Sequence, residues 1–133
     1  TTTYSLTQQA MRILCDGGRI IHFASVSSHV ANIGYSAYSS SKAGLSQLVR
    51  ITAREAAVRG ITVNAIGPAM TRTALTERYL SEPLFHQSAE QMIPLGRLGE
   101  LSDVMGAVNL LLSDAGGFIT GQTLYVDGGR TLC

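Results

Sequence analysis

The sequence has little of what several classes of protein require. It contains no tryptophan, two cysteines and three histidines among 133 residues, and the cysteines and histidines are scattered along the chain. A disulfide framework needs several paired cysteines, and a zinc site needs clustered Cys and His ligands, so neither kind of site is predicted and no metal is expected. We interpret Cys15 and Cys133 as free thiols.

Charged residues are also sparse, at 14% of the chain, and the formal net charge is +1. A chain of this kind has no large field to steer a polyanion, which argues against a nucleic acid partner. No segment approaches the ~18 apolar residues that a membrane-spanning helix requires. Because hydrophobic residues make up 45% of the chain, it can still form a core. We therefore expect a soluble cytoplasmic protein with a small-molecule substrate.

The hydrophobic pattern alternates between helical and extended segments. Buried strands are predicted at residues 19–25, 61–66 and 122–126. Helices are predicted at residues 1 to about 16, 35–59 and 102–113. Gly60 would end the second helix, and Ser102 would be the N-cap of the third. This order predicts an α/β domain of the Rossmann type, with a doubly wound parallel sheet of which three strands are visible.

Residues 70–96 have no clean period, and Pro83 and Pro94 would interrupt any single helix there. A long irregular segment inside a compact domain is usually functional. Because this segment follows the second strand directly, we predict a mobile lid over a substrate.

Three candidate site elements follow two of the predicted strands. Ser25 ends the first strand, Tyr38 and Lys42 lie near the start of the next helix, and the loop 67–73 follows the second strand. Open α/β sheets bind ligands at the carboxyl ends of their strands. These elements are therefore expected to meet at one edge of the sheet.

Tyr38 and Lys42 have the spacing of a proton-transfer pair. Residues i and i+4 of a helix share a face, and a lysine ammonium beside a phenol favours the phenolate, which lowers a tyrosine pKa from about 10 toward an operating pH. The Ser25 hydroxyl can donate a hydrogen bond to a substrate oxygen that gains negative charge. Taken alone, a tyrosine and a lysine at this spacing are usually solvated neighbours, so the surrounding strands carry the interpretation.

The remaining tempting residues have plainer explanations. His22 lies within a strand and is interpreted as a packed or edge residue, whereas His86 is expected to be solvated. His29 lies in the loop after Ser25, where a substrate role competes with ordinary surface polarity. The pair Gly128-Gly129 is interpreted as a turn and not as a phosphate-binding loop, because no predicted helix follows it.

Five segments, taken in order, resemble the C-terminal half of the short-chain dehydrogenase/reductase family: RIIHFASVSS, YSSSKAGL, RGITVNAIGP, IPLGRLGELSDV and ITGQTLYVDGG. The resemblance implies that Tyr38 is the acid/base and that Ser25 orients the substrate. It also implies that Lys42 binds the nicotinamide ribose beside Tyr38. The loop residues Pro68, Ala69, Thr71 and Thr73 would contact the nicotinamide end of NAD or NADP.

The chain departs from the family pattern at two loop positions and in one large respect. Ala69 stands where the family usually has glycine, and Thr71 where an aliphatic residue is more frequent. The family's glycine-rich phosphate turn and its NAD/NADP selector are absent. We therefore expect residues 1–133 to be the C-terminal part of a single Rossmann-type domain whose phosphate-binding part is missing, with an unpaired strand edge at residues 19–25.

The function implied by the resemblance is reversible hydride transfer between NAD or NADP and a secondary alcohol or ketone. A polyol, a sugar acid or a similar small hydroxy compound is the expected substrate, and reduction of a 3-oxoacyl thioester is the alternative. A different class of function, a non-catalytic half-domain used for packing or interaction, also stays open. The family resemblance further implies homodimers or homotetramers formed through the helix at 35–59 and the helix before it.

Overall fold

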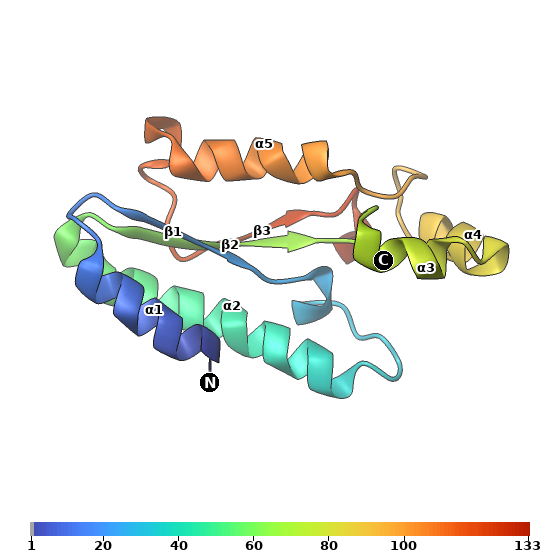
Figure 1. Cartoon of the computed structure of the whole chain (residues 1–133), viewed down its shortest axis with the longest axis horizontal. Helices are drawn as coiled ribbons and strands as arrows, with labels where there is room; N and C mark the ends of the chain where they lie inside the picture. The colour runs from blue at the N-terminus through green and yellow to red at the C-terminus, as the bar shows by residue number, and fades with distance from the viewer. Residues whose placement is uncertain (1) are drawn as a thin grey trace.

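The computed structural model describes residues 2–133 as three layers, with a parallel sheet between helices (Figure 1). The sheet contains β1 (Arg19–Phe23), β2 (Thr62–Pro68) and β3 (Thr123–Val126), in the order β1-β2-β3. Helices α1 (Thr2–Ile13) and α2 (Ser36–Ala56) cover one face, and α5 (Leu101–Leu112) covers the other. The predicted α/β architecture with three parallel strands is confirmed.

The central strand β2 has a core on each of its faces. Val63 and Ala65 are fully buried and pack with Val49 and Ala53 of α2. On the other face, Ile66 packs with a buried cluster from α5. A parallel strand covered by helices on both faces needs apolar residues in a nearly continuous run, which explains why this segment of the sequence alternates so little.

Strand β1 has one neighbour among residues 2–133. It pairs with β2 in a parallel register from Arg19 opposite Thr62 to Phe23 opposite Ile66, and its other edge is unpaired. This is the uncovered edge that the sequence predicts. Within the same described residues, no helix is both long enough and apolar enough to cross a membrane.

The ends of the helices show where sequence patterns are reliable. Helix α2 continues as a short 3-10 turn (Ala57–Arg59) and ends at Gly60, whose φ of 63° lies in the left-handed region. This confirms the predicted helix end. Arg59 then ties this end to the end of α1 and to the turn that follows it, because its guanidinium donates to Met11 O at 2.5 Å and to Asp16 Oδ1 at 2.8 Å.

The predicted N-cap of α5 is wrong. The helix begins at Leu101 with Glu100 as its N-cap, so Ser102 lies inside the first turn. Asp103 accepts a hydrogen bond from the Glu100 N–H at 2.8 Å and also receives two bonds from Arg97, at 2.7 and 2.9 Å. These contacts lower the pKa of Asp103 to about 2, the Arg97 hydrogen bond being the main cause. A carboxylate three residues after the cap is the sequence signal that marks this start.

The Arg97–Asp103 pair gives a first testable prediction. Because the pKa of Asp103 is lower in the folded chain than the ordinary value, its stabilising effect is complete above about pH 4 and is lost as the pH falls toward 2. Asp103→Asn should therefore lower Tm by a few degrees at pH 6, and the difference from the wild type should shrink as the pH approaches 2. Thermal unfolding across this range tests it, and a difference that does not vary with pH would refute it.

The segment 70–96 is more regular than predicted. It contains α3 (Ala74–Leu80) and α4 (Pro83–Gln91), and its residues Leu80, Ala89 and Ile93 form a buried cluster with Leu98, which follows the segment. As predicted, no single helix continues across Pro83, which occupies the first turn of α4, where a missing N–H costs nothing. Helices of two turns are too short to show a period in sequence. The mobility of this segment stays a prediction.

Candidate active site

The site lies at the carboxyl ends of β1 and β2. The first residues after each of these strands stay hydrogen-bonded to the neighbouring strand. Ala24 N–H donates to Ile66 O at 2.8 Å, and Ala69 N–H donates to Val126 O at 3.3 Å. The residues that follow β1 and β2 are therefore held next to the neighbouring strand. This arrangement brings the Ser25 turn and the loop 67–73 to the same edge of the sheet, as expected.

Ser25 is the N-cap of a short 3-10 turn (Val26–Ser28) and has extended backbone angles. It is buried, and its Oγ accepts a hydrogen bond from the Ser27 N–H at 3.1 Å. Because the oxygen is held as an acceptor, the hydroxyl proton remains free to be donated.

Tyr38 and Lys42 lie on one face of α2 with the side chains close together. The Lys42 Nζ is 5.7 Å from the centroid of the Tyr38 ring and donates a hydrogen bond to Phe23 O at 2.7 Å. This bond fastens the ammonium to the last residue of β1, two positions before Ser25. Tyr38 is 46% exposed, so its hydroxyl can reach a bound molecule. The structure thus brings the predicted pair together and joins it to the strand that carries the serine.

The loop residues have mostly local partners. The Thr71 hydroxyl donates to Ala69 O at 3.0 Å, and Thr71 forms an isolated parallel bridge with Gly99. Thr73 caps α3, where its Oγ accepts from the Thr76 N–H at 3.3 Å. These contacts shape the loop from Pro68 to Thr73 and hold it against the start of α5.

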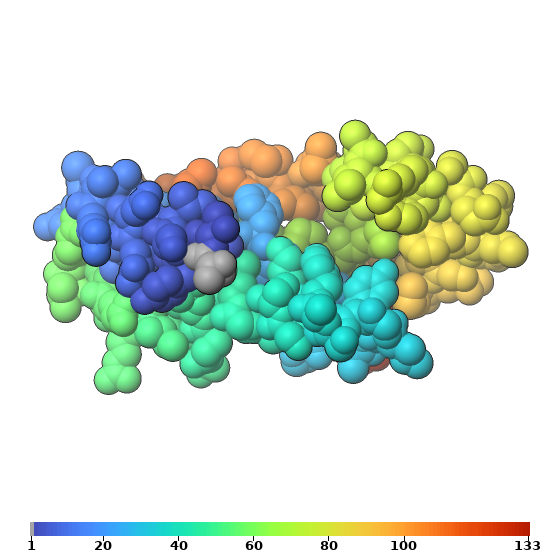
Figure 2. All heavy atoms as spheres, turned by 60° about the horizontal axis from the view of Figure 1, so that its bottom comes forward, coloured from blue at the N-terminus to red at the C-terminus, as the bar shows by residue number. Residues whose placement is uncertain are grey.

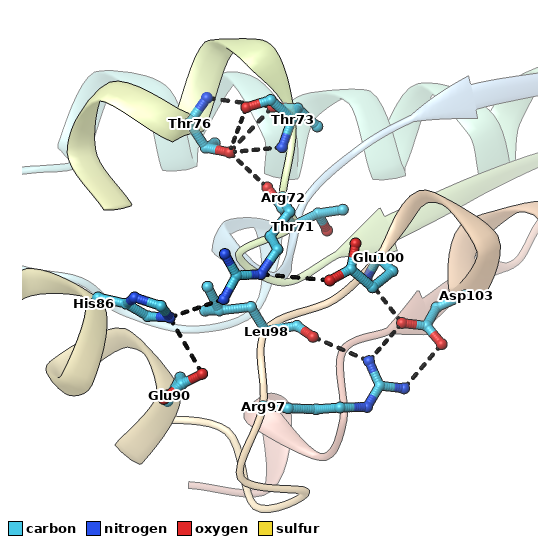
Figure 3. A network of polar contacts seen from close by, with 10 residues as sticks. All are labelled: Thr71, Arg72, Thr73, Thr76, His86, Glu90, Arg97, Leu98, Glu100 and Asp103. Carbon is cyan, nitrogen blue, oxygen red and sulfur yellow. Dashed lines mark hydrogen bonds and ion pairs between the residues drawn. The ribbon is translucent and has the colours of Figure 1, made fainter. Parts of the chain in front are cut away.

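Sequence reasoning missed the polar network beside this loop, which centres on Arg72 (Figure 3). The Arg72 guanidinium contacts Glu100 Oε1 at 3.4 Å and His86 Nε2 at 3.0 Å, and His86 is also 3.2 Å from Glu90 Oε1. His86 is therefore half-buried in a network and not solvated as predicted. Arg72 joins the loop to both α4 and the start of α5, and its position directly after Thr71 gives no sequence signal for these distant partners.

The other two histidines have the environments that the sequence suggests, one packed within a strand and one exposed in a loop. His22 Nε2 is 3.3 Å from Thr7 Oγ1 of α1, and burial lowers the pKa of His22, so it is a packed strand residue. His29 is exposed, and its ring centroid is 5.8 Å from that of Tyr125 in β3.

Gly128 and Gly129 form a turn with positive φ angles, as the sequence predicts, and a short 3-10 turn (Arg130–Leu132) follows them.

The donor set at the site fits a ribose. A lysine ammonium has three protons, and only one of those of Lys42 is used by Phe23 O. Among residues 2–133 no carboxylate forms an ion pair with Lys42. The remaining protons can therefore reach neutral hydroxyl acceptors, and the exposed Tyr38 lies beside them.

Comparison with known proteins gives a consistent family. The sequence model of the family described as Enoyl-(Acyl carrier protein) reductase matches residues 1–131. A 3-oxoacyl-[acyl-carrier-protein] reductase of Synechocystis sp. is 41% identical over 86% of this chain and 45% of its own length. A 3beta-hydroxysteroid dehydrogenase of Eggerthella lenta is 39% identical over 86% of the chain and 44% of its own length.

A solved structure of similar fold is that of the angucycline C-6 ketoreductase LanV with bound NADP, which has a TM-score of 0.90 and 30% identity. It matches 98% of this chain but 50% of its own chain. The chain thus spans about half the length of the relatives it matches. The five sequence motifs, the parallel three-stranded sheet and these matches agree, and the chain therefore belongs to the short-chain dehydrogenase/reductase family.

Proposed function

We propose that the protein to which this chain belongs is an oxidoreductase that transfers a hydride between NAD or NADP and a secondary alcohol or ketone. One observation carries the proposal: Lys42 lies beside the Tyr38 ring while it is hydrogen-bonded to the end of β1, next to Ser25. A phenol, an ammonium and a free hydroxyl proton at the end of a parallel sheet form an acid/base site for an alcohol or carbonyl oxygen.

Each residue has one task in this mechanism. In the reductive direction, Ser25 donates a hydrogen bond to the carbonyl oxygen and stabilises the negative charge that develops there. Tyr38 then gives its proton to that oxygen, and the Lys42 ammonium stabilises the phenolate that results. In the oxidative direction, Tyr38 receives the proton from the alcohol. When bound, the nicotinamide cofactor supplies or accepts the hydride.

Lys42 and Tyr38 would hold the ribose hydroxyls of the cofactor, and the loop from Pro68 to Thr73 would contact its nicotinamide end. The Thr71 and Thr73 hydroxyls already have partners within the loop, so they would support its shape more than they bind directly. Ala69 packs against the buried cluster of Leu80, Ala89, Ile93 and Leu98, which also supports the shape of the loop. The bound NADP described for the similar ketoreductase LanV supports a nicotinamide dinucleotide as the cofactor.

The substrate we propose is a polyol, a sugar acid or a similar small hydroxy compound, with a 3-oxoacyl thioester as the second candidate. The similarity to a 3-oxoacyl-[acyl-carrier-protein] reductase supports the second candidate, and the similarity to a 3beta-hydroxysteroid dehydrogenase supports a secondary alcohol or ketone in general. Nicotinamide absorbance should be followed with NAD and NADP against a panel of both substrate classes. A cofactor titration separates either activity from a non-catalytic packing module, because such a module would bind neither dinucleotide.

We also propose that the protein assembles as a homodimer or homotetramer through α1 and α2, which lie side by side on one face of the molecule (Figure 2). A groove of about 390 Å³ runs between them and is lined by Tyr4, Met11, Leu48 and Ile51. Ile51 is 49% exposed, which leaves apolar area for a second copy to cover. A monomer in light scattering at micromolar concentration would count against this assembly.

Lys42→Ala should weaken two properties at once. The ammonium is placed both to stabilise the Tyr38 phenolate and to bind the ribose, so we expect turnover to fall and the Kd of the cofactor to rise, each by about tenfold or more. Steady-state kinetics and a fluorescence titration with the reduced cofactor measure the two effects. Lys42→Arg keeps the charge and serves as the control. A Lys42→Ala variant with unchanged cofactor affinity would remove the binding role.

A further inference from the structure

Tyr125, in β3, packs directly beneath the serine turn. Its ring lies against Gly67 of β2, where a Cβ atom would be only 2.6 Å from Tyr125 Cδ1 and 3.4 Å from the carbonyl carbon of Ser25. Because Gly67 has no side chain, the ring of Tyr125 can lie close to the backbone of Ser25 at this position. The sequence analysis gave Tyr125 no role.

The hydroxyl of Tyr125 reaches the same turn. It lies 2.9 Å from Ser28 Oγ, and Ser28 Oγ in turn donates to the Ser25 carbonyl oxygen at 2.7 Å. A serine hydroxyl has a single proton. Since that proton is given to Ser25 O, the bond between Tyr125 and Ser28 must be donated by Tyr125. The result is a directed chain from Tyr125 through Ser28 to the backbone of Ser25.

This chain controls the orientation of Ser25. The Ser25 carbonyl accepts from the Ser28 N–H at 3.0 Å as well as from the Ser28 hydroxyl, and its Oγ accepts from the Ser27 N–H. These three contacts lie within the turn. The bond from the Tyr125 hydroxyl to Ser28 comes from outside the turn. Hydrogen bonds in a chain strengthen one another, so removing the outer donor also weakens the bond to Ser25.

We propose that Tyr125 is a positioning residue for the reaction, which aims the Ser25 hydroxyl at the substrate oxygen by acting through Ser28. The inference rests on the proposed function, because it assigns a purpose to the orientation of Ser25. Tyr125 lies 97 positions from Ser28 in sequence, and both its hydroxyl bond to Ser28 and its ring contact with His29 are made to the serine turn, of which His29 is the C-cap. Its effect on turnover therefore passes entirely through the serine turn.

The test is a set of single and double variants of the full-length protein, with kcat and cofactor Kd measured for each. Tyr125→Phe keeps the ring on Gly67 and removes only the hydroxyl. It should lower kcat about tenfold with little change in cofactor Kd, because a small misplacement of a catalytic group is enough to slow the reaction. Ser28→Ala should have the same effect, Ser28→Thr should restore most of the rate, and Tyr125→Phe combined with Ser28→Ala should be no slower than either alone.

The decisive readout is the Ser25→Ala background. If Tyr125 acts by aiming Ser25, Tyr125→Phe should have no further effect once the Ser25 hydroxyl is gone. Tyr4→Phe, which removes a tyrosine hydroxyl that accepts a hydrogen bond from Gln8 on α1, away from the serine turn, is the matched control and should keep the full rate.

Two outcomes would overturn the inference: full activity in Tyr125→Phe, or an equal loss from Tyr125→Phe with and without Ser25, which would indicate a general structural role. Failure of the proposed function is distinguishable, because the wild-type protein would then show no turnover with NAD or NADP. Unchanged turnover in Ser25→Ala would also overturn the inference, since Ser25 would then have no catalytic role for Tyr125 to support.

Discussion

Tyr38→Phe in the full-length protein is expected to lower turnover by about 10² to 10⁴-fold, the range that general acid/base catalysis contributes. The substitution removes one oxygen and its proton, and neither Ser25 nor Lys42 replaces it, since in the proposed mechanism their protons hold the substrate oxygen and the ribose. Lys42 would still hold the ribose hydroxyls, so the cofactor Kd should change little.

Tyr35→Phe is the matched control for this experiment. Tyr35 lies three residues before Tyr38, is exposed to a similar degree, and packs against it edge to face at 6.2 Å between ring centroids. Its hydroxyl has no role in the mechanism, and the variant should retain nearly full turnover. Steady-state rates with saturating cofactor measure both variants. Retention of a third of the activity by Tyr38→Phe would exclude it as the acid/base residue.

The parts of this site that could be predicted are those that local sequence determines. Tyr38 and Lys42 face the same direction because they are four residues apart on a helix, and the helix is set by its own pattern and its glycine end. Ser25 could be placed because a short apolar strand precedes it and parallel strands end at a common edge. These inferences need no knowledge of distant contacts.

The parts that could not be predicted depend on contacts between segments far apart in sequence. The Arg72 network joins the loop after β2 to α4 and to the start of α5, and the hydroxyl of Tyr125 meets Ser28 across 97 positions. Neither contact leaves a periodic or motif signal. The helices α3 and α4 were missed for a related reason, since their stability comes from the shared cluster around Leu80 and Ala89 and not from a long amphipathic pattern.

The position of Arg72 suggests why the segment 70–96 can be both folded and tied to the site. The guanidinium bridges His86 of α4 and Glu100, while the backbone of Arg72 donates to Gly99 O at 2.9 Å. The loop that would hold the nicotinamide end is thereby connected to α4 and to the start of α5 by the same residue. The predicted lid and the loop that would hold the cofactor therefore share the contacts of Arg72.

Gly67→Ala is expected to destabilise the fold by about 1–3 kcal/mol, the usual cost of overpacking a core. The added Cβ would lie 2.6 and 2.8 Å from two carbons of the Tyr125 ring, in a fully packed strand. The ring must move to make room. Its hydroxyl would then leave Ser28, so turnover should fall together with stability. Urea unfolding and kcat, measured on the same preparations, test the two effects.

Two further variants separate the clash from the loss of the hydroxyl. Gly106→Ala in α5 has nothing within 4 Å of the new Cβ. It should raise the free energy of unfolding by about 0.5–1 kcal/mol, because a helix interior is more stable with alanine than with glycine.

Adding Tyr125→Ala to Gly67→Ala relieves the contact, so the combined loss of stability should be smaller than the sum of the two single losses. Turnover should not recover in that double variant, since the donor to Ser28 is still absent. A Gly67→Ala protein as stable as the wild type would show that the Tyr125 ring is not held against β2, and a double variant that regained turnover would show that Ser25 does not need the hydroxyl of Tyr125.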